Sequence, residues 1–141
     1  MISKNIEIID IPKITDTRGN LSVIENNVVP FDIKRVYYLY DVPSGAERGG
    51  HSHKELFEFL VALSGSFDVI LKDGESEKTV TLNRPNQGLL IKSGIWRELE
   101  NFSSGSVCLV VASDVYKEED YIREYDEFLV FKSTQPNIKN L

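Results

Sequence analysis

Two histidines, His51 and His53, are the only imidazoles in the chain, and a single residue separates them. Side chains alternate between the two faces of a β-strand, so a strand through this segment would place both rings on one face. Glu58 follows five residues after His53, inside the next apolar run. Two imidazoles and a carboxylate in one cavity could hold a metal ion or move a proton.

Glycines bracket this group, and the spacing from Gly45 to Gly65 resembles the first motif of the cupin superfamily, G-x5-H-x-H-x3–4-E-x6-G. The resemblance implies an all-β fold, the double-stranded β-helix or jelly-roll barrel of the cupins. In metal-binding cupins the two histidines and the glutamate of this motif are three metal ligands.

The second cupin motif, P-x-G-x2-H-x3-N, matches the segment ending at Asn101 only in part, because Lys92 replaces the proline and Arg97 replaces the histidine. A guanidinium stays protonated and has no lone pair for a cation, so it would repel a divalent metal. We therefore predict that Glu58 forms an ion pair with Arg97 across the barrel interior and that the protein binds no metal or other cofactor. A metal site of two histidines and Glu58, with Arg97 outside it, is the alternative.

Without a metal, the histidine pair is suited to proton transfer, because imidazole titrates near neutrality. Such a pair could remove the acidic hydrogen beside a ketone and help to return a proton to the neighbouring carbon, which is isomerase chemistry. The alternative is that His51 and His53 are relics in a binding module that catalyses nothing.

Basic and aromatic residues surround the histidines and indicate a ligand. Clustered cations would suit phosphate oxygens, and flat rings would suit a base or a sugar. The candidates are Arg35, Arg48, Lys54 and Arg97, with Tyr37, Tyr38, Tyr40 and Trp96. The competing interpretation is that the charges are solvated and that the tyrosines alternate between the core and a dimer contact.

The elements that must position these residues are mostly strands. Apolar runs of strand length, rich in β-branched and aromatic residues, recur about every ten residues, which favours a sandwich or barrel. We predict hairpin turns at Ser64–Ser66 and Lys72–Gly74. The runs are Ile33–Val42, Phe57–Leu63, Phe67–Leu71, Thr79–Leu82, Gly88–Ile91 and Val107–Ala112.

One segment departs from the strand pattern. From Ser113 to Phe131 the apolar residues fall at helical spacing, with Asp114 as a candidate cap, so we predict a short C-terminal helix. Residues 1–133 are expected to form a single cupin domain, and residues 134–141 a polar tail.

Composition narrows the class of protein. The chain has 141 residues and a net charge of −6, which argues against nucleic acid or an anionic membrane as a partner. The single cysteine, Cys108, excludes an intramolecular disulfide and fits a cytoplasmic protein. No apolar run approaches the length of a membrane span, and polar residues follow Met1 where a signal peptide would be apolar.

Six blocks along residues 5–130 resemble the sugar 3,4-ketoisomerases, which are cupins that act on dTDP-4-keto-6-deoxyglucose. These blocks are Asp16–Leu21, Pro30–Tyr38, Arg48–Lys54, Trp96–Leu99, Asn101–Ser103 and Asp120–Tyr125. The resemblance implies a metal-independent isomerase that moves the ketone from C4 to C3 of the dTDP-linked sugar. It also implies a place in the synthesis of 3-amino-3,6-dideoxyhexoses for lipopolysaccharide (including O-antigen), surface-layer or antibiotic glycans.

The same resemblance implies roles for individual residues. His51 would be the principal base and His53 would lie beside it, with Tyr37 against the hexose and Arg48 and Lys54 facing the diphosphate. The family is typically homodimeric, often with exchanged N-terminal strands. The full set of expected substrate contacts is Arg18, Arg35, Tyr37, Arg48, Lys54, Trp96 and Arg97.

Three positions vary within that family. Glu58 stands where many members have glutamine, which reopens the question of a metal. Positions 18 and 97 are expected to touch the sugar and to influence which face of C4 receives the proton. Arg18 resembles the branch that gives the galacto product and Arg97 the branch that gives the gluco product, and we favour galacto. A metal-dependent cupin enzyme and a non-catalytic nucleotide-sugar-binding cupin are the alternative functions.

Overall fold

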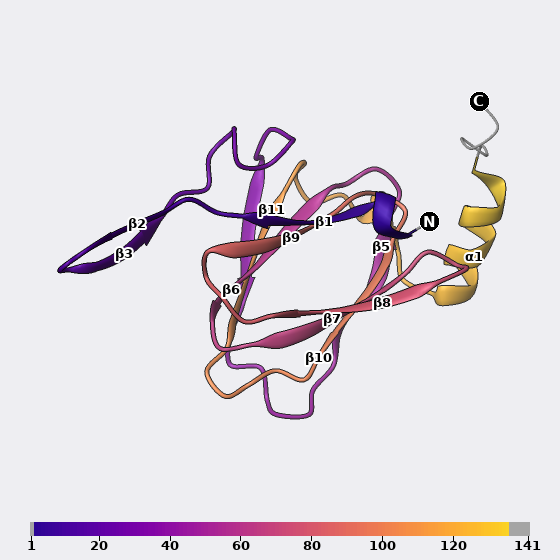
Figure 1. Cartoon of the computed structure of the whole chain (residues 1–141). Helices are drawn as coiled ribbons and strands as arrows, with labels where there is room; N and C mark the ends of the chain where they lie inside the picture. The colour runs from indigo at the N-terminus through magenta and orange to yellow at the C-terminus, as the bar shows by residue number, and fades with distance from the viewer. Residues whose placement is uncertain (1, 136–141) are drawn as a thin grey trace.

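The computed structural model describes residues 2–135, which fold into two antiparallel five-stranded sheets packed face to face, with a separate two-stranded hairpin (Figure 1). The first sheet has the order β1 (Ile6–Asp10), β9 (Gln87–Ile91), β6 (Glu58–Ser64), β11 (Val107–Ala112) and β4 (Arg35–Leu39). The second has the order β12 (Tyr121–Ile122), β5 (Arg48–His53), β10 (Trp96–Glu100), β7 (Phe67–Lys72) and β8 (Glu77–Leu82).

The chain crosses repeatedly between the two sheets, as in a jelly roll. Strand β5 lies in the second sheet, β6 in the first, β7 and β8 in the second and β9 in the first. Each predicted strand run overlaps one of the observed strands. The expected all-β cupin barrel with one short C-terminal helix is therefore confirmed.

Alternation along the strands builds the barrel interior. In β6, Leu60 and Ala62 point into the core between the sheets, while Phe59 and Val61 belong to a second apolar cluster on the outer face. The interior partners from the second sheet include Phe67, Val69, Leu71, Leu82 and Leu99. Since both faces of β6 are covered, its sequence is a continuous apolar run and does not alternate with polar residues.

The outer faces are covered by different segments. Side chains of residues 24–33 pack on the outside of the first sheet. On the second sheet, Phe128 of α1 (Tyr125–Thr134) packs against Trp96 and Ile122. None of the helices among residues 2–135 is long and apolar enough to cross a membrane.

The hairpin of β2 (Lys13–Asp16) and β3 (Gly19–Ser22) projects away from the barrel (Figure 1). All eight of its strand residues are exposed, including Ile14 and Leu21. Among residues 2–135 this hairpin has no apolar partner surface of its own. Apolar side chains held in this way are typical of a segment that packs against another molecule.

Two local expectations were wrong. The turn at Ser64–Ser66 does not close a hairpin, because β6 and β7 belong to different sheets; the turn after Lys72 does, between β7 and β8. The C-terminal helix begins at Tyr125, so Asp114 does not cap it. The two 3₁₀ turns, η1 (Ile2–Lys4) and η2 (Glu118–Asp120), do not begin at Asp114 either.

The reason is long-range pairing. Residues 121–122 pair with β5 as β12, and this interrupts the helical spacing that the local sequence suggests. The helix includes Thr134, the first residue of the predicted tail. Residues 136–141 lie outside the described residues, so the tail stays a prediction.

Gly88 allows a close approach inside the first sheet, and its replacement by alanine is expected to destabilise the fold. A Cβ at Gly88 would overlap the ring of Phe59, which is fully buried and cannot move aside. We expect Gly88→Ala to lower the free energy of unfolding by about 1–3 kcal/mol, measured by urea denaturation. Lys78→Ala, at an exposed position of β8, is the control and should change it by less than about 0.5 kcal/mol. Equal stability of the Gly88→Ala variant and the wild type would contradict this packing.

Candidate functional site

Neighbouring strands of the second sheet place the histidines and Arg97 on one face. His51 and His53 are alternate residues of β5, and His51 lies opposite Arg97 of β10 in the register. The register then shifts, because Leu99 pairs with Arg48, so β5 has one more residue than β10 between these two pairs. The strand assignment and the common face of the two rings are as predicted.

Glu58 reaches this group from the other sheet. It is the first residue of β6, and its Oε1 accepts a hydrogen bond from Nη1 of Arg97 at 2.6 Å. The Tyr37 hydroxyl donates to Oε2 of Glu58, also at 2.6 Å. The side chains of Arg97 and Glu58 are each 2% exposed. The predicted ion pair across the barrel is therefore confirmed.

The two histidines contact each other directly. Their Nε2 atoms lie 3.1 Å apart, and Nδ1 of His53 lies 3.1 Å from Oδ2 of Asp120. The Tyr121 ring lies beside both imidazoles, with centroid distances of 5.2 Å to His51 and 4.4 Å to His53. His53 is fully buried, whereas His51 is half-buried.

Burial and Arg97 control the protonation of the site. Burial first, and then the charge of Arg97, lower the pKa of His51 to about 3. His51 is therefore a neutral imidazole at physiological pH, which is the form that can accept a proton. Burial opposes ionisation of Glu58, but hydrogen bonding to His53 and the charge of Arg97 outweigh it and hold the pKa of Glu58 below its usual range.

Ligand atoms of His51, His53 and Glu58 lie within 4.8 Å of one another, as a metal site would require. The donor set nevertheless does not fit a metal. Both oxygens of Glu58 already accept hydrogen bonds, from Arg97 and Tyr37. The Arg97 guanidinium also donates to the carbonyl of Ile95, so its charge is fixed beside the three groups.

A cavity of about 290 Å³ opens beside this group, and His51, Glu58 and Arg97 line it. Three further arginines, Arg35, Arg48 and Arg123, line the same cavity, together with Tyr37 and Tyr121. Arg123 is paired with Glu118 at 2.8 Å. Within residues 2–135, Arg35 and Arg48 form no ion pair, and Nη1 of Arg35 is buried without a hydrogen-bond partner. These two guanidiniums are therefore available for an anionic ligand.

Three of the predicted ligand contacts lie elsewhere in the described chain. Arg18 is at the tip of the projecting hairpin, where its exposed side chain pairs with Asp16. Lys54 is exposed and lines no part of this cavity. Trp96 points away from the barrel interior and packs against Tyr125 and Phe128. Its ring also lies next to Gly50 of β5.

Sequence reasoning assigned no role to Asp120, Tyr121 or Arg123, although the structure brings them to the histidines and the cavity. They fall in the segment that we predicted as helix. A strand pairing of Tyr121 with His53 and Ile122 with Ser52 holds them there. The only sequence signal was that they belong to the Asp120–Tyr125 block that resembles the ketoisomerases.

Known proteins resemble the chain over most of its length. The family model described as "FdtA: WxcM-like, C-terminal" matches residues 4–133. The TDP-4-oxo-6-deoxy-alpha-D-glucose-3,4-oxoisomerase of Aneurinibacillus thermoaerophilus is 48% identical over 123 residues, which cover 86% of this chain and 88% of that protein.

Two solved structures are similar over almost the whole chain. One is a His-to-Asn variant of the 3,4-ketoisomerase QdtA from Thermoanaerobacterium thermosaccharolyticum in complex with TDP-4-keto-6-deoxyglucose, with 42% identity, a TM-score of 0.91, and coverage of 93% of this chain and 96% of that one. The other is the TDP-quinovose 3,4-ketoisomerase WlaRB from Campylobacter jejuni, with 49% identity, a TM-score of 0.86, and coverage of 90% and 98%. The chain belongs to the FdtA family of isomerases, the sugar 3,4-ketoisomerases.

Proposed function

We propose that this enzyme converts TDP-4-keto-6-deoxyglucose into a TDP-3-keto-6-deoxyhexose by histidine-mediated proton transfer between C3 and C4. TDP-sugar 3,4-ketoisomerase activity is supported by the relatives named above. The observation that carries the histidine mechanism is a neutral His51 on the cavity wall, hydrogen-bonded to a second imidazole.

The proposed steps balance without an oxidant or a metal. His51 removes the hydrogen at C3, which is acidic because the C4 carbonyl stabilises the resulting enediolate. The C4 oxygen takes up a proton as the C3 hydroxyl loses one, and C4 then receives a proton from the imidazolium pair. The ketone has moved from C4 to C3, and the histidines return to their starting state.

Tyr37 and the arginines are proposed to hold the substrate. Burial, reinforced by the Glu58 carboxylate, raises the pKa of Tyr37 far above its usual range, so its hydroxyl stays protonated. It donates that hydrogen to Glu58, and its oxygen is proposed to accept a hydrogen bond from a sugar hydroxyl. Arg48 and Arg35 are proposed to bind the diphosphate. Binding of the diphosphate by Lys54, which is exposed, stays a prediction.

A homodimer with exchanged N-terminal segments is proposed for the assembly. Strand β4 is an edge strand that exposes Val36 and Tyr38, followed by Tyr40, and the hairpin exposes Ile14 and Leu21. Packing a partner's hairpin on this edge would cover both apolar sets and bring Arg18 toward a second subunit's cavity. Sedimentation equilibrium is expected to give twice the chain mass, and a monomer would exclude the exchange.

Product analysis in deuterated buffer tests the function. The expected result is a 3-keto product with deuterium at C4, identified by NMR after incubation with TDP-4-keto-6-deoxyglucose. An epimerised product that keeps its ketone at C4 would indicate a sugar epimerase, and binding without turnover would indicate a non-catalytic cupin. Either result would contradict the proposal.

For the configuration at C4 we propose the galacto product, as Arg18 suggests. The 49% identity to a TDP-quinovose enzyme supports the gluco alternative. In product formed in ordinary water, where C4 carries hydrogen, the proton coupling between H4 and H5 decides between the two configurations, since it is large for gluco and small for galacto. We further propose that the enzyme acts in the cytoplasm and that its product feeds an aminotransferase in the synthesis of 3-amino-3,6-dideoxyhexoses for cell-surface glycans.

Chelators are expected to leave turnover unchanged, because Arg97 and Tyr37 occupy the oxygens of Glu58 that a metal would need. The measurement is kcat before and after dialysis against EDTA, with elemental analysis of the protein. Stoichiometric iron, manganese or zinc, together with activity lost to the chelator and restored by the metal, would instead establish a metal-dependent cupin.

A further inference from the structure

Asp120 extends the histidine pair into a line of three groups. The line runs from His51 through Nε2 of His53, 3.1 Å away, and from Nδ1 of His53 to Oδ2 of Asp120, also 3.1 Å away. Asp120 lies 67 residues beyond His53 in the chain, at the end of η2, and the pairing of β12 with β5 fixes it there. The proposed proton transfer requires only the first two groups, so Asp120 needs a separate explanation.

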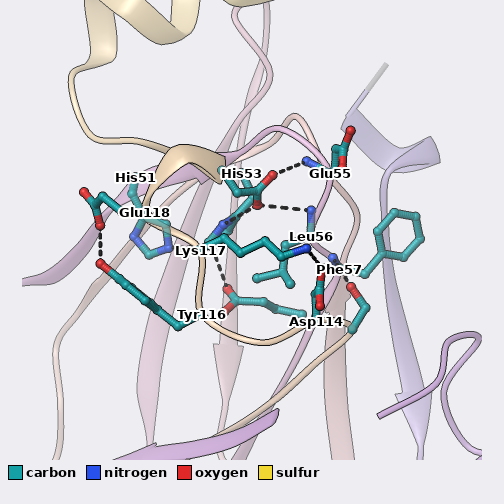
Figure 2. Close-up of polar contacts among 12 residues, drawn as sticks. His51, His53, Glu55, Leu56, Phe57, Asp114, Tyr116, Lys117 and Glu118 are labelled. Carbon is teal, nitrogen blue, oxygen red and sulfur yellow. Dashed lines mark hydrogen bonds and ion pairs between the residues drawn. The ribbon is translucent and has the colours of Figure 1, made fainter. Parts of the chain in front are cut away.

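The Asp120 carboxylate is held as a hydrogen-bond acceptor. The backbone N–H of Glu55 donates to its Oδ1 at 2.8 Å, and that of Leu56 donates to Oδ2 at 3.3 Å (Figure 2). An ionised carboxylate only accepts hydrogen bonds, so Nδ1 of His53 carries the hydrogen between the two side chains. In neutral His53 the lone pair is then on Nε2, where it faces Nε2 of His51 and can accept a proton from it. The same Nε2 lies 3.6 Å from Oε1 of Glu58, and it can donate to that oxygen only after it has taken up a proton.

The line of groups connects two different cavities. His51 lines the cavity of about 290 Å³, whereas His53 and Asp120 do not. His53 and Asp120 instead line a second cavity, of about 200 Å³, whose other walls include Ser113, Asp114 and Lys117. The Asp120 side chain is 15% exposed, whereas that of His53 is fully buried. The two cavities share Arg35 and Tyr121 as walls. We infer that a sugar nucleotide in the first cavity leaves the Asp120 end in contact with water.

We propose that Asp120 is a positioning residue that orients His53 and exchanges protons between the histidine pair and water in the second cavity. This proposal rests on the proposed isomerase function. A proton that His51 takes from C3 passes to Nε2 of His53, the hydrogen on Nδ1 of His53 passes to Asp120, and Asp120 releases it to water. The reverse sequence returns a solvent proton to His51 for delivery to C4. No proton is gained or lost overall, but the hydrogen that reaches C4 comes from water and not from C3.

Asp120→Asn separates orientation from proton exchange. With its oxygen in place of Oδ2, the amide can still accept hydrogen bonds from His53 and from the backbone N–H of Leu56, and it loses only the bond from the N–H of Glu55. An amide does not relay a proton. In deuterated buffer, with substrate carrying ordinary hydrogen at C3, we expect the fraction of product with hydrogen at C4 to rise several-fold over the wild type. We expect kcat to fall about 10- to 100-fold, as when a carboxylate behind a metal-bound histidine is replaced, with KM nearly unchanged.

Three further variants complete the design. Asp114→Asn changes another carboxylate of the second cavity that does not contact His53, and it should match the wild type in both kcat and isotope content. Asp120→Glu retains a titratable group and should restore exchange in part. His53→Gln interrupts the same line at the ring, and it supplies the isotope measurement if Asp120→Asn does not fold.

The isotope content separates this inference from the proposed function. Absence of turnover by the wild type would refute the isomerase function itself. Turnover by the wild type with ordinary hydrogen retained at C4 would refute proton exchange through Asp120 while leaving the isomerase function standing. The inference would also be overturned if the Asp120→Asn or His53→Gln product had the same deuterium content as the wild-type product. It would be overturned as well if Asp114→Asn retained as much hydrogen at C4 as Asp120→Asn.

Discussion

Replacement of His51 by asparagine is expected to abolish ketoisomerase turnover while leaving the fold and nucleotide-sugar binding intact. Asparagine fits the half-buried position on β5 and cannot accept the C3 hydrogen. Loss of a general base typically lowers kcat by about 10²–10⁴-fold. The measurement is the rate of 3-keto product formation by NMR, with circular dichroism and calorimetric titration of TDP as checks on folding and binding.

The acid stability of the His51→Asn variant gives a second readout. The folded-state pKa of His51, about 3, lies below its unfolded value of 6.5, so the unfolded chain binds the extra proton between these two values. His51 therefore favours unfolding increasingly as pH falls from 6.5 toward 3. The variant lacks this group, so its stability should decline less with pH over that range. Near-wild-type turnover of His51→Asn would refute the assignment of His51 as the base.

Replacement of Arg97 by leucine is expected to cause the largest loss of stability. Glu58 would remain buried with its charge uncompensated, and such a loss of one partner costs about 3–5 kcal/mol. The free energy of unfolding at pH 7, from urea denaturation, measures the effect. Because buried Glu58 can then take up a proton, the deficit relative to the wild type should shrink as the pH is lowered toward 4.

Glu58→Gln is the matched control for the ion pair. The glutamine oxygen can still accept from Arg97, so this variant should be less destabilised than Arg97→Leu. Combined with Arg97→Leu it leaves no buried charge in the pair, and the double variant should be more stable than Arg97→Leu alone. Additive losses in the double variant would show that the two side chains do not stabilise each other.

Wild-type stability should also fall in acid through Glu58. Its folded-state pKa is depressed below the usual 4.5, so the ion pair contributes its full stability above pH 4.5 and loses it as the pH falls further.

The sequence by itself determined which groups we propose for the chemistry. The alternation of residues in a strand requires His51 and His53 to share a face, and the guanidinium at position 97 is incompatible with a fourth metal ligand wherever its neighbours lie. Both inferences depend on properties of one short segment or one side chain. The strand runs were predicted for the same reason, since burial of alternate or continuous apolar residues is a local pattern.

Only the tertiary structure decided which residues complete the site. Asp120 reaches His53 across 67 positions of the chain, and it does so because residues 121–122 pair with β5 and do not extend the helix. Local spacing favoured a helix there, and the free energy of sheet pairing and burial outweighed that preference. Trp96 shows the converse, because its place in a motif suggested a ligand contact, whereas the alternation of β10 turns Arg97 inward and Trp96 outward beneath α1. Contacts between distant segments depend on how whole elements pack, and that information is absent from any single stretch of the sequence.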